Sequence, residues 1–223
     1  MAAARTRDRL LEHGALLFAR HGVDGVTARQ LHEAAGARNE SALQYHFGSK
    51  EGLALEILRR HLDAVEQRRA RLVAAIAAEG RERDLRTLVH ALAAPMAADL
   101  GTDAGRAHLR LVANLDHPSL AYRAPFRLTD APAGAAVARW LREALAALPE
   151  PVLVERLAAL REQLIGLMGR RAQLLDERPV GRRVGSTAVF LHNLVDVLVA
   201  GLAAPPSADT LAALRDAAAP PND

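Results

Sequence analysis

Helical periodicity runs through almost the whole sequence, and it constrains the fold more than any other feature of the chain. In the first segment, Leu10, Leu17 and Phe18 stand at positions i, i+7 and i+8, which places them on one face of a helix. No run of β-branched and aromatic residues alternates with polar residues at period two, so no strand is indicated. The sequence therefore predicts an all-α protein.

The composition of the 223 residues is that of a globular protein, because half are hydrophobic and a quarter are charged. Cysteine is absent, which excludes disulfides and thiolate metal sites. No secretory signal and no apolar stretch of about 18 residues is visible, so we expect a cytoplasmic protein without a membrane contact. The net charge of +3 is weak evidence for a nucleic-acid partner, since the position of the charges matters more.

The first 50 residues contain the start and stop signals of three short helices. Thr6 is a suitable N-cap for the first helix, and Gly22 is a suitable C-terminal cap. Thr27 and Gln30 match a capping box at the start of the second helix. We expect helices over 6–21, from Thr27 to Gly36, over 39–46 and over 51–78, the last capped by Ser49-Lys50-Glu51.

Short helices that carry small residues and are joined by a tight turn are what a helix-turn-helix requires. Gly36 supplies such a turn, because glycine accepts a positive φ. Prolines then mark the boundaries of further helices in the rest of the chain. We expect these helices over 82–99, 103–115, 132–148, 151–176, 182–203 and 207–218.

The segment Thr27–Leu53 resembles the N-terminal domain of TetR-type transcriptional regulators. It has a capped helix, an Ala-Gly turn, a helix that ends in Tyr45-His46-Phe47, and then Ser-Lys-Glu and a leucine. The first helix and Gly22 agree as well, so the resemblance covers residues 5–55. The turn after Gly36 is one residue longer than the common form, so the operator sequence does not carry over.

The resemblance implies a helix-turn-helix DNA-binding domain over 1–50 and a helical effector-binding and dimerisation domain over 51–223. It implies a homodimeric repressor, not an enzyme, that a small molecule releases from a palindromic operator in double-stranded DNA. An effector-independent or activating regulator of the same fold is the alternative. An all-α enzyme and a helical adaptor are more remote, because no catalytic motif is present and the residue types of 38–50 suit groove reading.

Position along the third helix separates base contacts from backbone contacts, because the N-terminal residues of a recognition helix enter the major groove. The candidates for base edges are Arg38, Asn39, Ser41 and Gln44, whose side chains suit guanine and adenine. A phosphate contact for Arg38 and a pure N-cap for Asn39 are the alternatives. The candidates for backbone contacts are Arg5, Thr27, Tyr45, His46 and Lys50.

The dimer is expected to form through helices 151–176 and 182–203. The first has leucines at a spacing of mostly four and three, as in paired helices, and the second is apolar on nearly every side. Gly166 and Gly169 would permit close approach. The alternative is that both helices fill the core of one subunit. The leucines are Leu153, Leu157, Leu160, Leu164, Leu167 and Leu174.

The partner expected in the second domain is a small apolar ligand, held between helices by apolar walls and a few polar groups. We expect no cofactor and no metal site, and we expect His192 and Asp196 to form a buried structural pair at the dimer interface. Simple packing is the alternative for every ligand candidate. The candidates are Met96, His108, Asn114, Tyr122, Phe126, Trp140, Phe190 and Asn193, with His90 and His192 considered beside them.

Overall fold

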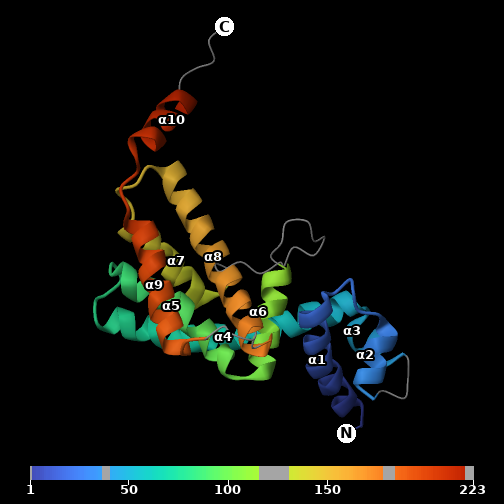
Figure 1. Cartoon of the computed structure of the whole chain (residues 1–223). Coiled ribbons are helices and arrows are strands. Elements are labelled where there is room, and N and C mark those ends of the chain that lie inside the picture. The colour runs from blue at the N-terminus through green and yellow to red at the C-terminus, as the bar shows by residue number, and fades with distance from the viewer. Residues whose placement is uncertain (1, 37–40, 116–130, 178–183, 219–223) are drawn as a thin grey trace.

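Every regular element of the described chain is a helix, which confirms the predicted all-α fold (Figure 1). The structure is a computed structural model that describes residues 2–36, 41–115, 131–177 and 184–218. The elements are α1 (Ala2–His21), α2 (Ala28–Ala34), α3 (Ala42–Phe47), α4 (Lys50–Ala78), α5 (Leu85–Ala97), the 3-10 helix η1 (Ala98–Gly101), α6 (Asp103–Leu115), α7 (Pro132–Ala144), α8 (Glu150–Glu177), α9 (Thr187–Ala203) and α10 (Ala208–Ala218).

Several helix boundaries differ from the prediction, and α5, for example, begins at Leu85 rather than at residue 82. α1 already begins at Ala2, because the alanines there are strong helix formers, so Thr6 lies inside the helix and is not its N-cap. α7 ends at Ala144 rather than at residue 148. α9 begins at Thr187 rather than at residue 182, since the Ser186 hydroxyl accepts a hydrogen bond from the Val189 N–H and caps the helix.

A first hydrophobic core lies between α1, α2, α3 and the beginning of α4. Leu10, Phe18, Leu31 and Leu53 are completely buried in it. Leu111 of α6 belongs to the same core, so the N-terminal helices pack directly against the larger helical body. The turn before α2 begins at Gly22, whose φ of 71° ends α1 as predicted.

Gly14 permits the close contact between α1 and α4. A Cβ atom at this position would lie 2.9 Å from Leu53 Cδ2 and 3.3 Å from Ile57 Cδ1. A glycine inside a helix costs about 1 kcal/mol relative to alanine. Here that local cost allows the backbone of α1 to approach two fully buried side chains of α4.

A second and larger core lies between α5, α7, α8 and α9. Leu88, Val137, Leu141 and Met168 are among its most deeply buried side chains. α4, with 29 residues, joins the two cores, since its first turns belong to the N-terminal core and Ile76 near its end belongs to the second. One rigid helix therefore connects the N-terminal helices with the rest of the molecule.

The leucines predicted to form the dimer contact of α8 are partly used within the chain itself. Leu153, Leu160 and Leu164 are buried in the second core, so this part of the prediction is wrong. Gly169 also packs internally, because a Cβ there would lie 2.5 Å from Ala113 Cβ, whereas Gly166 faces open space. A spacing of four and three marks any core-facing helix stripe, so it does not distinguish a partner helix from a neighbour in the same chain.

α10 follows Pro205 and Pro206 and points away from the helical body (Figure 1). No single described helix is long and apolar enough to cross a membrane. α9 together with residues 208–217 reaches the required length and composition, but the two are bent by 53° at their junction.

Replacing Gly14 by valine is expected to lower the free energy of unfolding by about 1–3 kcal/mol, because the new side chain must displace Leu53 or Ile57 in a packed core. Chemical denaturation monitored by circular dichroism measures this change. His13→Val is the matched control, since it places the same side chain on the neighbouring, half-buried position. Equal unfolding midpoints for the two variants would contradict the close-contact role of Gly14.

Candidate nucleic-acid interface

The second helix of the predicted helix-turn-helix has the expected cap. The Thr27 N–H donates to Gln30 Oε1 at 2.8 Å, and the Gln30 N–H donates to Thr27 Oγ1 at 3.3 Å. These reciprocal bonds confirm the capping box and fix the start of α2. The Thr27 N–H that was predicted to face a phosphate is thus engaged by Gln30 in this structure.

His32 of α2 holds the start of α3. Its buried ring accepts a hydrogen bond at Nε2 from the Leu43 N–H, with a donor–acceptor distance of 3.4 Å. Ser41 stands at the N-cap position of α3 without a side-chain cap hydrogen bond, so His32 satisfies an amide of the first turn that a cap would otherwise satisfy. This role could not be predicted from the sequence, because the contact joins residues eleven positions apart on two helices.

Gly36 ends α2 with a φ of 55°, as the predicted turn requires. A Cβ atom there would also lie 2.6 Å from Nη2 of Arg9, so the Arg9 side chain covers the turn. Arg38 and Asn39, two of the predicted base-reading residues, follow this turn and lie outside the described residues.

α3 exposes its remaining predicted DNA contacts to solvent. Ser41 and Gln44 are exposed, and Tyr45 is 81% exposed, which is a large fraction for an aromatic side chain. His46 is half-buried and lies edge-on to Tyr45, with ring centroids 5.0 Å apart. The opposite side of α3 buries Leu43 in the first core, so the helix presents one polar face outward.

The two predicted basic contacts behave differently. Arg5 is exposed on the first turns of α1. Lys50 begins α4, and its Nζ donates to the carbonyl oxygens of Asp24 and Val26 at 3.4 and 3.2 Å. Lys50 therefore holds the turn between α1 and α2 against the start of α4, at the flank of the helix-turn-helix.

Arg7 lies inside α1, and its side chain is half-buried. Its Nη2 donates to Glu56 Oε1 at 2.8 Å, and its guanidinium lies over the Phe47 ring at 5.5 Å. A hydrogen bond from Arg59 is the main cause that holds the pKa of Glu56 at about 2, with Arg7 and Arg60 adding to it against the effect of burial. Arg7 thus joins α1, α3 and α4.

Further along α4, a buried polar cluster joins this helix to η1 and α6. Arg68 Nη2 donates to both carboxylate oxygens of Asp99 at 2.8 Å, and His61 Nδ1 lies 3.3 Å from Asp99 Oδ2. Burial lowers the pKa of His61 to about 3, with the charges near His108 and Arg68 adding to the shift. Burial also lowers the pKa of His108, whose ring centroid lies 5.1 Å from that of His61. Both imidazoles are therefore neutral, and the described residues contain no group suited to hold a metal ion.

Glu66 joins α4 to α7. Its Oε1 accepts hydrogen bonds from the Ala133 and Gly134 N–H groups at 2.5 and 3.3 Å. Ala131, at the N-cap position of α7, has no side-chain oxygen, so the carboxylate of another helix takes the place of the cap. Buried Arg69 donates to Glu66 Oε2 at 3.0 Å and holds it in place.

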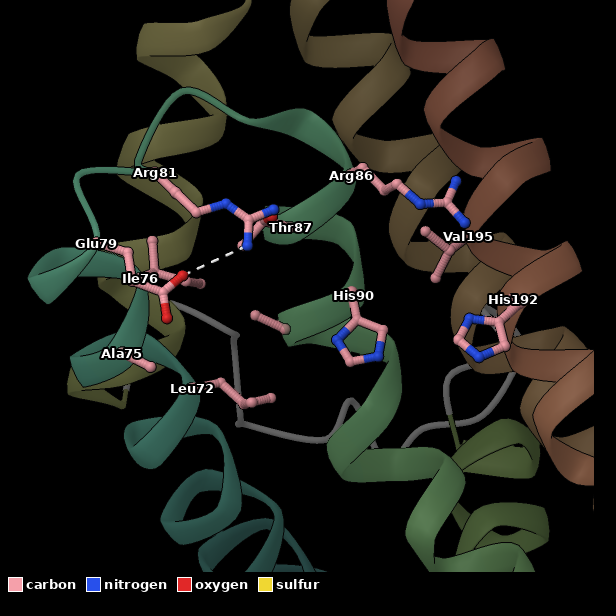
Figure 2. A pocket seen from close by; sticks show the side chains of 11 residues that line it. Leu72, Ala75, Ile76, Glu79, Arg81, Arg86, Thr87, His90, His192 and Val195 are labelled. Atoms are coloured by element: carbon pink, nitrogen blue, oxygen red, sulfur yellow. Dashed lines mark hydrogen bonds and ion pairs between the residues drawn. The ribbon is translucent and has the colours of Figure 1, made fainter.

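A pocket of about 410 Å³ lies between the end of α4, the beginning of α5 and α9 (Figure 2). Leu72 and Ile76 line it from α4, His90 from α5, and His192 and Val195 from α9. His192 was predicted to form a buried pair with Asp196. In the single subunit both residues are exposed and Asp196 is paired with Arg86, so the burial expected at the dimer interface stays a prediction.

Of the eight predicted ligand residues, the six that the structure describes do not line this pocket. Trp140 and Met96 pack in the second core, and His108 lies beside His61. Phe190 lies below the Arg171 guanidinium, at 5.1 Å from ring centroid to Cζ. Asn114 and Asn193 are exposed, and Tyr122 and Phe126 lie outside the described residues.

Comparison with known proteins agrees with this geometry. Residues 10–57 match the sequence profile described as "Bacterial regulatory proteins, tetR family". Over 54 residues the chain is 43% identical to the HTH-type transcriptional repressor AcnR of Corynebacterium glutamicum and, equally, to that of Corynebacterium efficiens. The matched segment is 24% of this chain and spans only 28% of the length of these relatives.

A likeness to a solved structure extends over most of the fold. The crystal structure of the probable transcriptional regulatory protein RHA5900 superposes on 89% of this chain and 100% of its own, with a TM-score of 0.53 and 23% identity. The helical body after α4 is therefore similar to that of a known protein in fold, while the sequence likeness to the curated relatives stays within the first helices.

Replacing His32 by alanine is expected to remove the hydrogen bond to the Leu43 amide and to loosen the first turn of α3. An unmatched buried amide costs about 1–3 kcal/mol, so the Leu43 amide should exchange with deuterium about tenfold or more faster. Hydrogen exchange monitored by NMR measures this rate. His32→Gln, whose amide oxygen also accepts a hydrogen bond, is the control, and an unchanged Leu43 rate in His32→Ala would refute the role of His32.

Proposed function

We propose that this chain, which belongs to the TetR family through its N-terminal domain, is a homodimeric transcriptional repressor that a small molecule releases from a palindromic operator. The family membership confirms the resemblance visible in the sequence. The observation that carries the proposal is the exposed polar face of α3, with Gln44 and Tyr45 outward and Leu43 buried. The match to relatives named as repressors supports repression over activation.

In the proposed complex, α3 enters the major groove. Ser41 and Gln44 face the base edges, and Tyr45 contacts the backbone through its exposed ring. Lys50 lies at the start of α4, where its ammonium exchanges the carbonyl oxygens of Asp24 and Val26 for a phosphate or reaches both. In the two domains proposed from the sequence, residues 1–50 carry these DNA contacts, and residues 51–223 form the helical body that positions them.

The proposed dimer forms through α8 and α9. Leu167 of α8 is 41% exposed, and Val189 and Val197 of α9 are 65% and 52% exposed, so apolar side chains remain uncovered on these helices. Gly166 faces open space beside Leu167 and leaves room for a helix of a second copy. A two-fold dimer would place two α3 helices about one turn of DNA apart, which requires a near-palindromic operator.

Release by a ligand requires that the ligand bind one arrangement of the dimer better than the other. α4 is the element through which that difference reaches the N-terminal helices, since it contributes to both hydrophobic cores. An effector-independent regulator of the same fold is the second candidate. The pocket between α4, α5 and α9 favours the ligand-controlled form.

The first experiment is the binding of the purified protein to a pool of randomised DNA, with sequencing of the retained molecules at two salt concentrations. The proposal predicts an enriched near-palindrome whose affinity falls steeply as salt rises, because phosphate contacts release counterions. Retention without any enriched sequence would overturn the proposal of an operator-binding repressor.

Gln44→Ala and Lys50→Ala are expected to affect this binding in different ways. Loss of a base contact at Gln44 should cost about 1–3 kcal/mol on the selected site and relax the preference at one position. Loss of the Lys50 charge should weaken all sequences alike and reduce the salt slope by about one. Fluorescence anisotropy on the selected site and on single-base variants measures both effects. A change of base preference in Lys50→Ala with unchanged overall affinity would contradict these roles.

Val197→Asp is expected to dissociate the dimer, because it places a charge in the centre of the proposed apolar contact. Analytical ultracentrifugation should show monomer, and affinity for the full palindrome should fall to that for a half-site. Val154→Asp is the matched control, since Val154 is 45% exposed and lies on a different face of α8 from Leu167. A Val197→Asp variant that stays dimeric would place the dimer contact elsewhere.

A further inference from the structure

The pocket between α4, α5 and α9 has an apolar floor and a polar rim (Figure 2). Leu72, Ile76 and Val195 form the floor, with Ala75 and Ala91 beside them. Its volume of about 410 Å³ lies within the range of small-molecule sites in proteins. The floor therefore suits the hydrocarbon part of a small ligand.

The rim consists mainly of hydrogen-bond donors and imidazoles. Arg81 and Arg86 contribute guanidinium groups, and His90 and His192 contribute rings that lie nearly parallel, with centroids 6.5 Å apart and an angle of 16° between their planes. Glu79 is the one carboxylate among the lining residues, and it already accepts a hydrogen bond from Arg81 at 3.4 Å.

The guanidinium groups keep free N–H groups for a ligand. Arg81 bonds Glu79 and Asp84, and Arg86 pairs with Asp196, in each case at the rim of the pocket. A guanidinium has five N–H donors, so each side chain can bind a further acceptor without breaking these pairs. About half of the Arg86 side chain is exposed, and it is reachable from solvent.

We infer that this pocket binds a small organic acid, with the hydrocarbon part on the floor and the carboxylate between Arg86, His90 and His192. The inference rests on the proposed function and specifies its effector, because an apolar molecule without an acidic group would not use the rim. Arg is the preferred partner of a carboxylate, since its planar fork can donate two parallel hydrogen bonds.

The state of His90 supports an anionic ligand. Burial lowers the pKa of His90, and electrostatic interaction with His192 and Arg86 lowers it further. Burial is thus the main cause that keeps His90 neutral, and the positive potential of its neighbours adds to it. A bound carboxylate would counter that potential and raise the pKa of His90 again, so binding should be accompanied by proton uptake near neutral pH.

The position of the pocket fits control of DNA binding. Leu72 and Ile76 belong to the end of α4 that is remote from the N-terminal helices, while His192 and Val195 belong to α9, a helix of the proposed dimer contact. An acid held there would contact both elements that set the distance between the two α3 helices. If the acid bound more tightly to a dimer with one spacing of the α3 helices than to a dimer with another, its binding would release the DNA.

The experiment uses the full-length chain and pairs of compounds that differ only in charge. Octanoate, 4-phenylbutyrate and 1-naphthoate are each compared with the corresponding primary amide by isothermal titration calorimetry in two buffers of different ionisation enthalpy. At least one acid should bind about tenfold or more tightly than its amide, with net proton uptake. Equal affinity of acid and amide throughout the panel would overturn the inference.

Arg86→Gln and His192→Gln should each reduce the affinity for the acid about tenfold or more. The double variant Arg86→Gln with Asp196→Asn removes both charges of the existing ion pair. If the single and the double variant lose the same affinity for the acid, the loss is not caused by an unpaired Asp196 carboxylate. Arg142→Gln is the matched control, because Arg142 forms a similarly exposed pair with Glu150 at 2.9 Å on α7. Unchanged affinity in the pocket variants, or an equal loss in Arg142→Gln, would overturn the assignment of the site.

Binding of the same variants to the selected palindrome, without any acid, separates this inference from the proposed function. If every variant binds the palindrome but no acid is preferred, the pocket assignment fails alone. If an acid binds through Arg86 while no operator is found, the repressor proposal fails and the binding site stands.

Discussion

The packing of α4 into two hydrophobic cores is the constraint on which the rest of the structure depends. Its first turns pack against α1, where Gly14 permits the close contact. Its end packs against α5 in the larger core. Polar contacts fix its course between these points. Arg68 of α4 donates a hydrogen bond to the Asp99 carboxylate, and the carboxylate of Glu66 caps the start of α7. A displacement of α4 along its axis would therefore break charge-assisted hydrogen bonds as well as apolar contacts.

This attachment would determine how a ligand bound in the proposed pocket acts on the N-terminal helices. Packed cores have few alternative arrangements, so α4 is expected to tilt as a rigid body rather than to bend. The neutral His61 and His108 beside Asp99 give the middle of α4 a polar contact of low net charge. The contacts of Leu53 and Ile57 near the N-terminal end hold α1 and α4 together.

Local signals in the sequence predicted the N-terminal helices well and the rest of the site poorly. The Thr27 capping box and the turn at Gly36 are confirmed, because caps and turns are set by residues a few positions apart. The Leu153 to Leu164 stripe was assigned to a partner helix but lies in the chain's own core. The pocket unites α4, α5 and α9, so no periodicity within one helix indicated its lining, although residue type alone had drawn attention to His90 and His192.

The residues that escaped prediction share a physical property. Gly14 looks unfavourable inside a helix, Ala131 looks like a missing cap, and His32 is a polar side chain on a buried face. In each case a residue distant in the chain compensates for the unfavourable residue. Leu53 packs against Gly14, Glu66 caps α7, and the Leu43 N–H donates a hydrogen bond to His32. Local rules are broken where helices from separate parts of the chain meet, and these meeting points place α3 and orient α4. An unfavourable residue in an otherwise regular helix is thus a marker of a tertiary contact.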